Sequence, residues 1–122
     1  MKVFLDDFRM PLDAAKYMHT RVGSKNPIYL DKWEVVRNYD EFVKVVSGNF
    51  DFITHVSFDH DLADEHYATE SWEQTDLYLE KTGLDCAKWL KNFYQENQTD
   101  LPEIFIHSMN PVGTENIKNV FL

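Results

Sequence analysis

Residues 51–61, DFITHVSFDHD, join an apolar run to a dense group of charged side chains. The run over 51–58 is short and rich in aromatic and β-branched residues, which is typical of a strand inside a sheet. Asp59, His60 and Asp61 follow directly. A helix face could carry such residues as solvated surface, whereas the end of a buried strand gathers them at one place. The stretch therefore predicts an interior strand over 51–58 that ends at a polar site.

Three more segments have this form, and amphipathic segments separate them. The predicted strands cover residues 2–5, 33–37, 51–58 and 103–107; the predicted helices cover 12–19, 38–48, 82–97 and the residues from Pro111 on. Strands that alternate with helices predict an α/β fold, an open and mostly parallel sheet of about four strands with helices on both faces. We expect strand order 2-1-3-4, which makes strands one, three and four neighbours.

Two of the predicted helices carry clear start signals. Thr82 and Asp85 have the spacing of a capping box. Asn110 followed by Pro111 is typical of an N-cap and a first helical position. Cys86, the single cysteine, falls on the apolar face of the helix over 82–97, so we expect it to be structural and not nucleophilic.

The composition fits one packed domain over residues 1–122. The chain has 43% hydrophobic residues, and its 21 acidic and 12 basic residues give a net charge of −9. This charge argues against binding to duplex nucleic acid or to an anionic membrane. It leaves a phosphate ligand open, because a bound divalent cation can invert the local field. One cysteine and an N-terminus that turns acidic at Asp6 fit a cytoplasmic protein.

Residues 63–81 are acidic and rich in aromatic residues, and they lack clean periodicity. We interpret them as an insertion in the domain. Tyr67, Trp72 and Tyr78 make it a candidate surface for a protein partner. Glu65 and His66 match no zinc-binding spacing, so zinc is disfavoured.

Acidic side chains follow two of the neighbouring strands. Asp6 and Asp7 end the first strand, and Asp59 ends the third. Carboxyl ends of parallel strands meet at one edge of the sheet, where ligands bind in open α/β folds. Three carboxylates there would repel one another, and Mg²⁺ or Mn²⁺ would relieve the repulsion. In the alternative interpretation, Asp6 caps a turn while Asp7 and Asp59 pair with Arg9.

Two histidines also lie at predicted strand ends. His107 and His60 are beside carboxylates that could tune them for proton transfer, and we expect both, together with Asp59, to be catalytic. The alternative for each histidine is a hydrogen bond to backbone alone.

The start of the last helix is a candidate phosphate site. Free amides and the positive end of the helix dipole favour a phosphate there. The polar residues expected to bind phosphate or substrate are Ser108, Asn110, Gly113 and Asn116 in this segment, with Arg9 and Asp61 nearby. A capped helix with no ligand is the alternative. No P-loop, GxGxxG or GxSxG motif is present, which disfavours nucleoside-triphosphate hydrolysis, dinucleotide chemistry and α/β-hydrolase chemistry.

Four sequence blocks together resemble the cyclic-phosphate processing receiver domain family of bacteria and their phages. The blocks are LDDFRMP (5–11), VSFDHDL (56–62), TGLDCAKWL (82–90) and IHSMNPVGTENI (106–117). The resemblance implies a truncated receiver-like (flavodoxin-like) fold, with Asp6 and Asp7 as the metal-binding pair and Asp59 at the phosphoacceptor position. It further implies that His107, Ser108 and Asn110 complete a site that processes a cyclic phosphate, such as one on an RNA end or a nucleotide.

Three functions follow as hypotheses. The first is a Mg²⁺- or Mn²⁺-dependent phosphoesterase, a hydrolase of a cyclic or terminal phosphate. The second is a noncatalytic receiver-like binding module whose acidic pocket holds metal or a phosphorylated ligand. The third is a phosphorylatable signalling receiver, which is disfavoured because no candidate fifth strand carries the lysine that signalling receivers place there.

Overall fold

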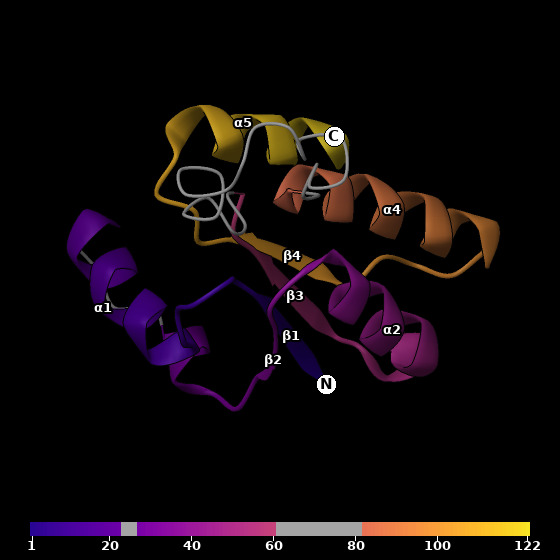
Figure 1. The fold of residues 1–122 in the computed structure, drawn as a ribbon, viewed down its shortest axis with the longest axis horizontal. Coiled ribbons are helices and arrows are strands. Elements are labelled where there is room, and N and C mark those ends of the chain that lie inside the picture. The colour runs from indigo at the N-terminus through magenta and orange to yellow at the C-terminus, as the bar shows by residue number, and fades with distance from the viewer. Residues whose placement is uncertain (23–26, 61–81) are drawn as a thin grey trace, which may run out of the picture.

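The computed structural model describes residues 1–22, 27–60 and 82–122 (Figure 1). The predicted insertion over 63–81 lies outside these residues. The strands are β1 (Lys2–Leu5), β2 (Glu34–Val36), β3 (His55–Phe58) and β4 (Glu103–Ile106). The helices are α1 (Pro11–Val22), α2 (Tyr39–Asn49), α4 (Gly83–Glu96) and α5 (Pro111–Val120), with short 3₁₀ helices η1 (Pro27–Leu30) and η2 (Phe50–Phe52).

The four strands form one parallel sheet in the order β2-β1-β3-β4. This confirms the predicted α/β fold and its strand order. The register aligns Leu5 of β1 with Phe58 of β3, and Phe58 with Ile106 of β4. The residues that follow these three therefore leave the sheet side by side.

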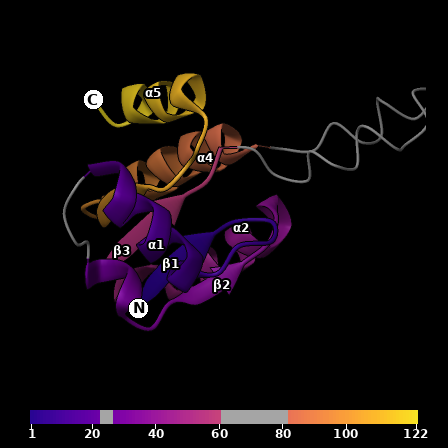
Figure 2. The ribbon, with the colours of Figure 1, turned by 90° about the vertical axis from the view of Figure 1, so that its left-hand side faces the viewer.

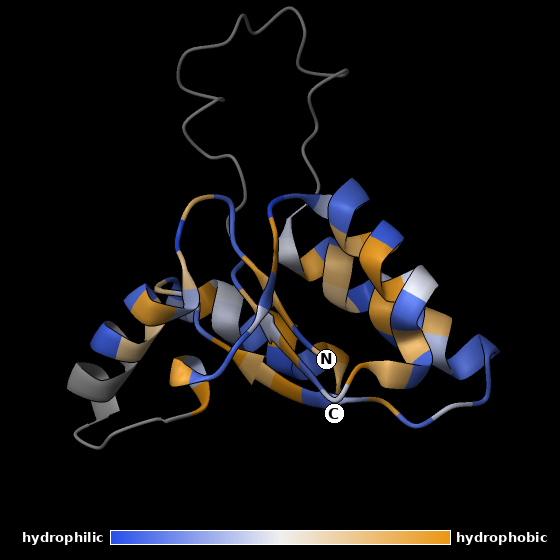
Figure 3. Cartoon of the chain, turned by 90° about the horizontal axis from the view of Figure 1, so that it is seen from below, coloured by the Kyte–Doolittle hydropathy of each residue, from blue (hydrophilic) through white to orange (hydrophobic). Residues whose placement is uncertain are grey.

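Helices cover both faces of the sheet, as predicted. One core joins apolar side chains of the strands, such as Leu5 and Phe58, to Phe42 of α2, Leu90 of α4 and Ile117 of α5. Figure 2 shows α4 and α5 side by side on this face. Hydrophobic residues lie on the strands in the interior and hydrophilic ones on the outer turns of the helices (Figure 3).

The second face carries a smaller core built by α1, η1 and the segment before β2. Phe4 of β1 is buried there with Ala14, Tyr29 and Trp33. The rings of Phe4 and Tyr29 meet edge to face, with centroids 6.1 Å apart. This face differs from the first because polar groups of the sheet also enter it, as described below.

Helix boundaries follow the predicted capping signals. The Thr82 side chain accepts from the Asp85 amide, and the Asp85 side chain accepts from the Thr82 amide, which completes the capping box of α4. Asn110 caps α5 and Pro111 is its first residue. Cys86 is fully buried on α4, in agreement with a structural role.

Two predicted boundaries are wrong. The strand predicted from residue 51 begins at His55, because Phe50–Phe52 continue α2 as the 3₁₀ turn η2. Phe50, the first residue of η2, packs edge to face on Phe93 and Tyr94 of α4, and these contacts hold the 3₁₀ turn against that helix. The helix predicted over 12–19 is longer, at Pro11–Val22. Within the described part of the chain, no helix is long and apolar enough to cross a membrane.

Candidate functional site

The sheet register places three predicted site residues next to one another. Asp6, Asp59 and His107 are the first residues after the aligned ends of β1, β3 and β4. Their backbones continue the ladder, since the Asp59 amide donates to Leu5 O (3.0 Å) and the His107 amide donates to Phe58 O (3.0 Å). Asp6 and His107 are fully buried and Asp59 nearly so.

Asp6, Asp7 and Asp59 form a carboxylate cluster. One oxygen from each side chain lies within 4.8 Å of the others. Asp6 and Asp59 are buried and Asp7 is half-buried. Ionised carboxylates repel at this separation in a partly desolvated site, and a divalent cation among them would reverse that repulsion. The three residues offer only oxygen ligands, the donor type that Mg²⁺ and Mn²⁺ prefer, so they fit such an ion.

Asp6 is held in place by backbone amides on one carboxylate oxygen and by side chains on the other. Its Oδ1 accepts from the amides of Phe8 (3.0 Å) and Arg9 (2.9 Å). Its Oδ2 lies 3.1 Å from Nε2 of His107 and 3.7 Å from the Arg9 guanidinium. A carboxylate oxygen has two lone pairs, so the two amides fill Oδ1. By this count Oδ2 is the Asp6 oxygen that keeps a lone pair beyond its hydrogen bond with His107.

The loop after β1 is also fixed from β2. Arg37, the residue after Val36, donates through Nη1 to the backbone oxygens of Asp6 (3.2 Å) and Arg9 (2.8 Å). Its Nη2 lies 3.2 Å from Sδ of Met10. Arg37 thus orients the loop that carries Asp6 and Asp7, a role that its sequence did not reveal. In the alternative interpretation Asp6 caps a turn, and its side chain does accept from the amides of Phe8 and Arg9. The same residue also belongs to the carboxylate cluster.

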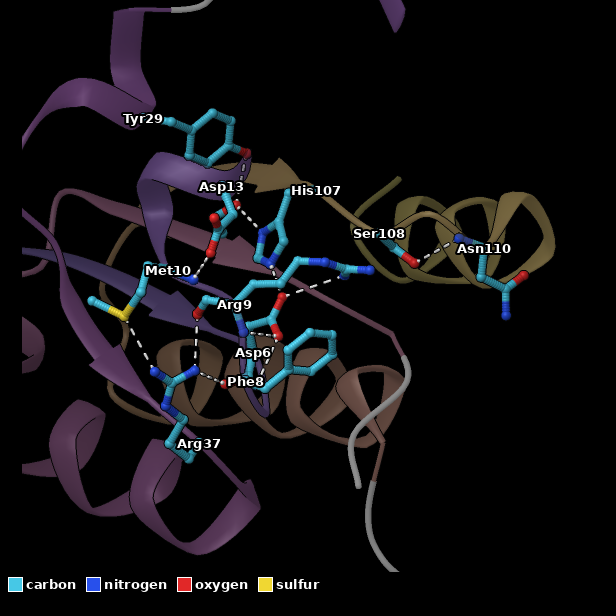
Figure 4. A network of polar contacts seen from close by, with 11 residues as sticks. Asp6, Phe8, Arg9, Met10, Asp13, Tyr29, Arg37, His107, Ser108 and Asn110 are labelled. Carbon is cyan, nitrogen blue, oxygen red and sulfur yellow. Dashed lines mark hydrogen bonds and ion pairs between the residues drawn. The ribbon is translucent and has the colours of Figure 1, made fainter. Parts of the chain in front are cut away.

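His107 contacts Asp6 on one side and a buried polar pair on the other. Its Nδ1 lies 2.7 Å from Oγ of Ser57, and this hydroxyl lies 2.8 Å from the hydroxyl of Tyr29. Figure 4 shows His107 between Tyr29 and Asp6. The order Ser–His–Asp resembles a hydrolase triad, but Ser57 is fully buried, so no substrate reaches its hydroxyl. The trio is therefore a buried network and not a nucleophilic triad.

The charge states in this network follow from burial and hydrogen bonding. Burial lowers the pKa of His107 and outweighs the Asp6 carboxylate, which acts to raise it. Burial acts to raise the pKa of Asp6, yet hydrogen bonds from His107 and from the amides of Arg9 and Phe8 lower it overall. A neutral His107 therefore donates through Nε2–H to an ionised Asp6.

We expect this pair to make the fold sensitive to acid. Because the pKa of His107 is lowered from 6.5, the unfolded chain takes up a proton on this residue at a pH where the folded chain does not. The free energy of unfolding should thus fall as the pH drops below 6.5. Asp6, with its pKa lowered from 3.8, should add a second fall in the more acidic range.

Urea unfolding at a series of pH values measures this effect. Comparison with His107→Gln isolates the first contribution, because the variant has no imidazole to protonate. If the free energy of unfolding changed with pH equally in the wild type and in His107→Gln just below pH 6.5, the expectation would be contradicted.

The start of α5 follows His107 in the chain, and the helix cap already uses some of its backbone amides. The Asn110 amide donates to Oγ of Ser108 (3.1 Å), and Oδ1 of Asn110 accepts from the Gly113 amide (3.0 Å). Of the first three residues of α5, Pro111 has no amide hydrogen and the Gly113 amide donates to Asn110, which leaves the Val112 amide as the donor outside this cap. A phosphate at this helix end would therefore meet Val112 and the Ser108 hydroxyl.

The open space at Gly113 is filled by the chain itself. A Cβ at Gly113 would overlap the ring of His60, coming within 2.8 Å of its Cδ2. His60 is half-buried, and its imidazole packs against α5 in the space that a side chain at position 113 would fill. Asn116 is exposed in the second turn of α5. Asp61 lies outside the described residues.

Ser57 and Tyr29, like Arg37, are site-region residues that the sequence did not single out. Ser57 had a usable signal, since it stands two residues before Asp59 and so lies on the same face of the strand. Tyr29 had none, because it comes from a segment without periodicity.

Comparison with known proteins identifies a family for the chain. The family model described as cyclic-phosphate processing receiver domain matches residues 1–122. No curated protein and no solved structure gives a significant match. Because the match runs over the whole sequence, and the parallel sheet in order 2-1-3-4 agrees with a receiver fold, the chain belongs to the cyclic-phosphate processing receiver domain family.

Proposed function

We propose that this protein is a phosphoesterase that opens a cyclic phosphate on a nucleotide or an RNA end with the help of Mg²⁺ or Mn²⁺. The observation that carries the proposal is the cluster of Asp6, Asp7 and Asp59 at the carboxyl edge of the sheet. The family description supplies the substrate class. In the reaction, water adds to phosphorus, one P–O bond of the ring breaks, and the departing oxygen takes a proton.

Each part of the site has a task in this proposal. Asp6, Asp7 and Asp59 would hold the cation, which when bound polarises a phosphoryl oxygen. The Ser108 hydroxyl and the Val112 amide would donate hydrogen bonds to the nonbridging oxygens at the start of α5. Asn110 holds this helix start in shape through its cap.

The two histidines differ in their suitability for proton transfer. His107 is fully buried, with both ring nitrogens in contact with Asp6 and Ser57, which favours an action through Asp6. His60 is half-buried and follows Asp59 directly. We therefore assign the proton transfer to His60 and keep His107 as a residue that orients the cluster.

Arg9 provides positive charge near the cluster. Its guanidinium lies 3.7 Å from Oδ2 of Asp6 and 5.1 Å from the centre of the Phe8 ring. A cation at Oδ2 would repel it, and a phosphate would attract it. Arg9 would thus turn from Asp6 to the substrate when the site is filled.

A noncatalytic binding module is the second candidate, favoured by the full burial of His107. Purified protein should be incubated with 2′,3′-cyclic nucleotides and with RNA that ends in a cyclic phosphate, with Mg²⁺ or Mn²⁺, and the phosphomonoester followed by phosphorus NMR. We expect turnover, with a loss of about a hundredfold or more in His60→Ala. His55→Gln, a change at the opposite end of β3, is the control and should keep most of the activity.

Binding measurements separate the two candidates. If the wild type binds these ligands in the presence of the cation but produces no phosphomonoester, the binding module is correct and the phosphoesterase proposal fails. Equal turnover by wild type and His60→Ala would remove His60 from the proposed mechanism.

A further inference from the structure

A continuous row of buried polar groups runs from η1 along the second face of the sheet to the carboxylate cluster. Tyr29, Ser57, His107 and Asp6 succeed one another at 2.8, 2.7 and 3.1 Å. Each of the four residues is at most 1% exposed. Polar groups are expensive to bury in a small domain, and an apolar residue at position 57 would pack between Phe4 and Phe105, its partners in β1 and β4. The row therefore needs an explanation beyond packing.

The hydrogen bonds of this row have one consistent direction. The ionised Asp6 can only accept, so Nε2 of His107 carries a hydrogen and donates. In the neutral ring Nδ1 is then an acceptor, and the Ser57 hydroxyl must donate to it. With its single hydrogen used, Ser57 accepts from the Tyr29 hydroxyl. The direction thus runs from Tyr29 to Asp6, and each donor strengthens the next.

The plane of the His107 ring is fixed as well as its hydrogen bonds. Phe4 stacks on it, with ring centroids 4.1 Å apart and planes 9° from parallel. Tyr29 meets it edge to face, with centroids 6.1 Å apart at 77°. Stacking permits the ring to turn in its own plane, whereas the bonds at Nδ1 and Nε2 prevent this. Ser57 and Tyr29 therefore complete the orientation that Phe4 begins.

The geometry points to Tyr29 and Ser57 as positioning residues that hold the Nε2–H of His107 on Oδ2 of Asp6 and thereby aim that carboxylate at a divalent cation. The inference rests on the proposed function, in which Asp6 is a cation ligand. It also gives the segment between α1 and β2 a role, because that segment brings Tyr29 onto the sheet. Hydrogen-bond partners of a metal ligand commonly control metal affinity in this way.

The test compares two buried tyrosines on opposite faces of the sheet. Tyr29→Phe removes the first donor of the row. Tyr94→Phe is the matched control, because Tyr94 is equally buried and its hydroxyl donates to Phe50 O (3.1 Å), away from the cluster. Ser57→Ala removes the hydroxyl between Tyr29 and His107, and it is the variant to measure if Tyr29→Phe folds poorly. The readouts are Mn²⁺ affinity and the nitrogen NMR signals of the His107 ring in metal-free protein.

We expect Ser57→Ala to weaken Mn²⁺ binding about tenfold, and Tyr29→Phe to weaken it less but in the same direction. In metal-free protein, both should move the Nδ1 signal of His107 toward that of a ring nitrogen without a hydrogen bond. Tyr94→Phe should change neither readout. If the Tyr29 and Ser57 variants keep wild-type Mn²⁺ affinity, the inference is wrong, whether or not the Nδ1 signal moves.

The outcomes also separate this inference from the proposed function. A wild type that binds no Mn²⁺ would refute the cation site and, with it, the aiming of Asp6. A wild type that binds Mn²⁺ with an affinity that neither variant alters would leave the cation site intact and refute the positioning role alone.

Discussion

Gly83→Ala is expected to destabilise the fold by about 3 kcal/mol, the upper part of the range for overpacking a buried site. A Cβ at Gly83 would overlap the carbonyl oxygen of Asp59 and come within 2.9 Å of the Cα of His60. These are backbone atoms of the loop that carries the candidate site, and they cannot rotate away. The Gly83 amide also donates to His60 O (2.7 Å), so the new methyl group would strain the bond that joins α4 to this loop.

Two other glycines provide matched controls for urea unfolding. At Gly113 the three atoms nearest to an added Cβ are Cγ, Cβ and Cδ2 of His60, with no backbone atom among them, so the cost of Gly113→Ala should be smaller than that of Gly83→Ala. His60→Ala should relieve only part of it, because the Cβ of residue 60 remains. Gly48→Ala has no neighbour within 4 Å and should stabilise α2 by about 0.5–1 kcal/mol. Equal effects of Gly83→Ala and Gly113→Ala would show that the Asp59–His60 loop is not held as described.

Asp59→Asn is expected to lower the affinity for Mg²⁺ or Mn²⁺ by about a hundredfold or more. Loss of a residue that only hydrogen-bonds to a metal ligand already lowers metal affinity by up to about a hundredfold, and Asp59 is proposed as a ligand itself. The variant keeps the shape of the side chain but removes one of the three charges that lie within 4.8 Å of one another. Thermal unfolding with and without the cation measures this loss, because a ligand in excess stabilises the folded state by an amount that grows with the logarithm of its concentration divided by its Kd.

The control is Asp51→Asn, which changes the net charge equally in η2, before the opposite end of β3. Asp51 is exposed, so this variant should respond to the cation as the wild type does. If Asp51→Asn and Asp59→Asn lose the response equally, the cation acts through overall charge and not through the cluster.

The sheet and the carboxylate cluster could be predicted from sequence for the same reason. A parallel strand buried on both faces is a run of apolar residues, and the first polar residues after it mark its carboxyl end. Asp6, Asp7 and Asp59 stand at such ends, so strand order alone brings them together. The capping signals at Thr82 and Asn110 were equally local, and both helix starts agree with them.

The structure of the second face could not be predicted, because it depends on contacts between distant segments. Tyr29 reaches Ser57 across 28 residues, and Ser57 reaches His107 across 50. A histidine at a strand end has the same sequence signature whether it faces solvent or a buried serine. Its role is decided by Phe4 and Tyr29, which cover it. The space at Gly113, expected to admit a ligand, is likewise taken by His60, a tertiary contact.

Calorimetric titration of the metal-free protein with Mg²⁺ tests the central claim most directly. We predict one cation bound per chain in the wild type, with binding lost or severely weakened in Asp59→Asn and retained in Asp51→Asn. Absence of Mg²⁺ and Mn²⁺ binding by the folded wild type, or unchanged binding by Asp59→Asn, would contradict the assignment of Asp6, Asp7 and Asp59 as a cation site.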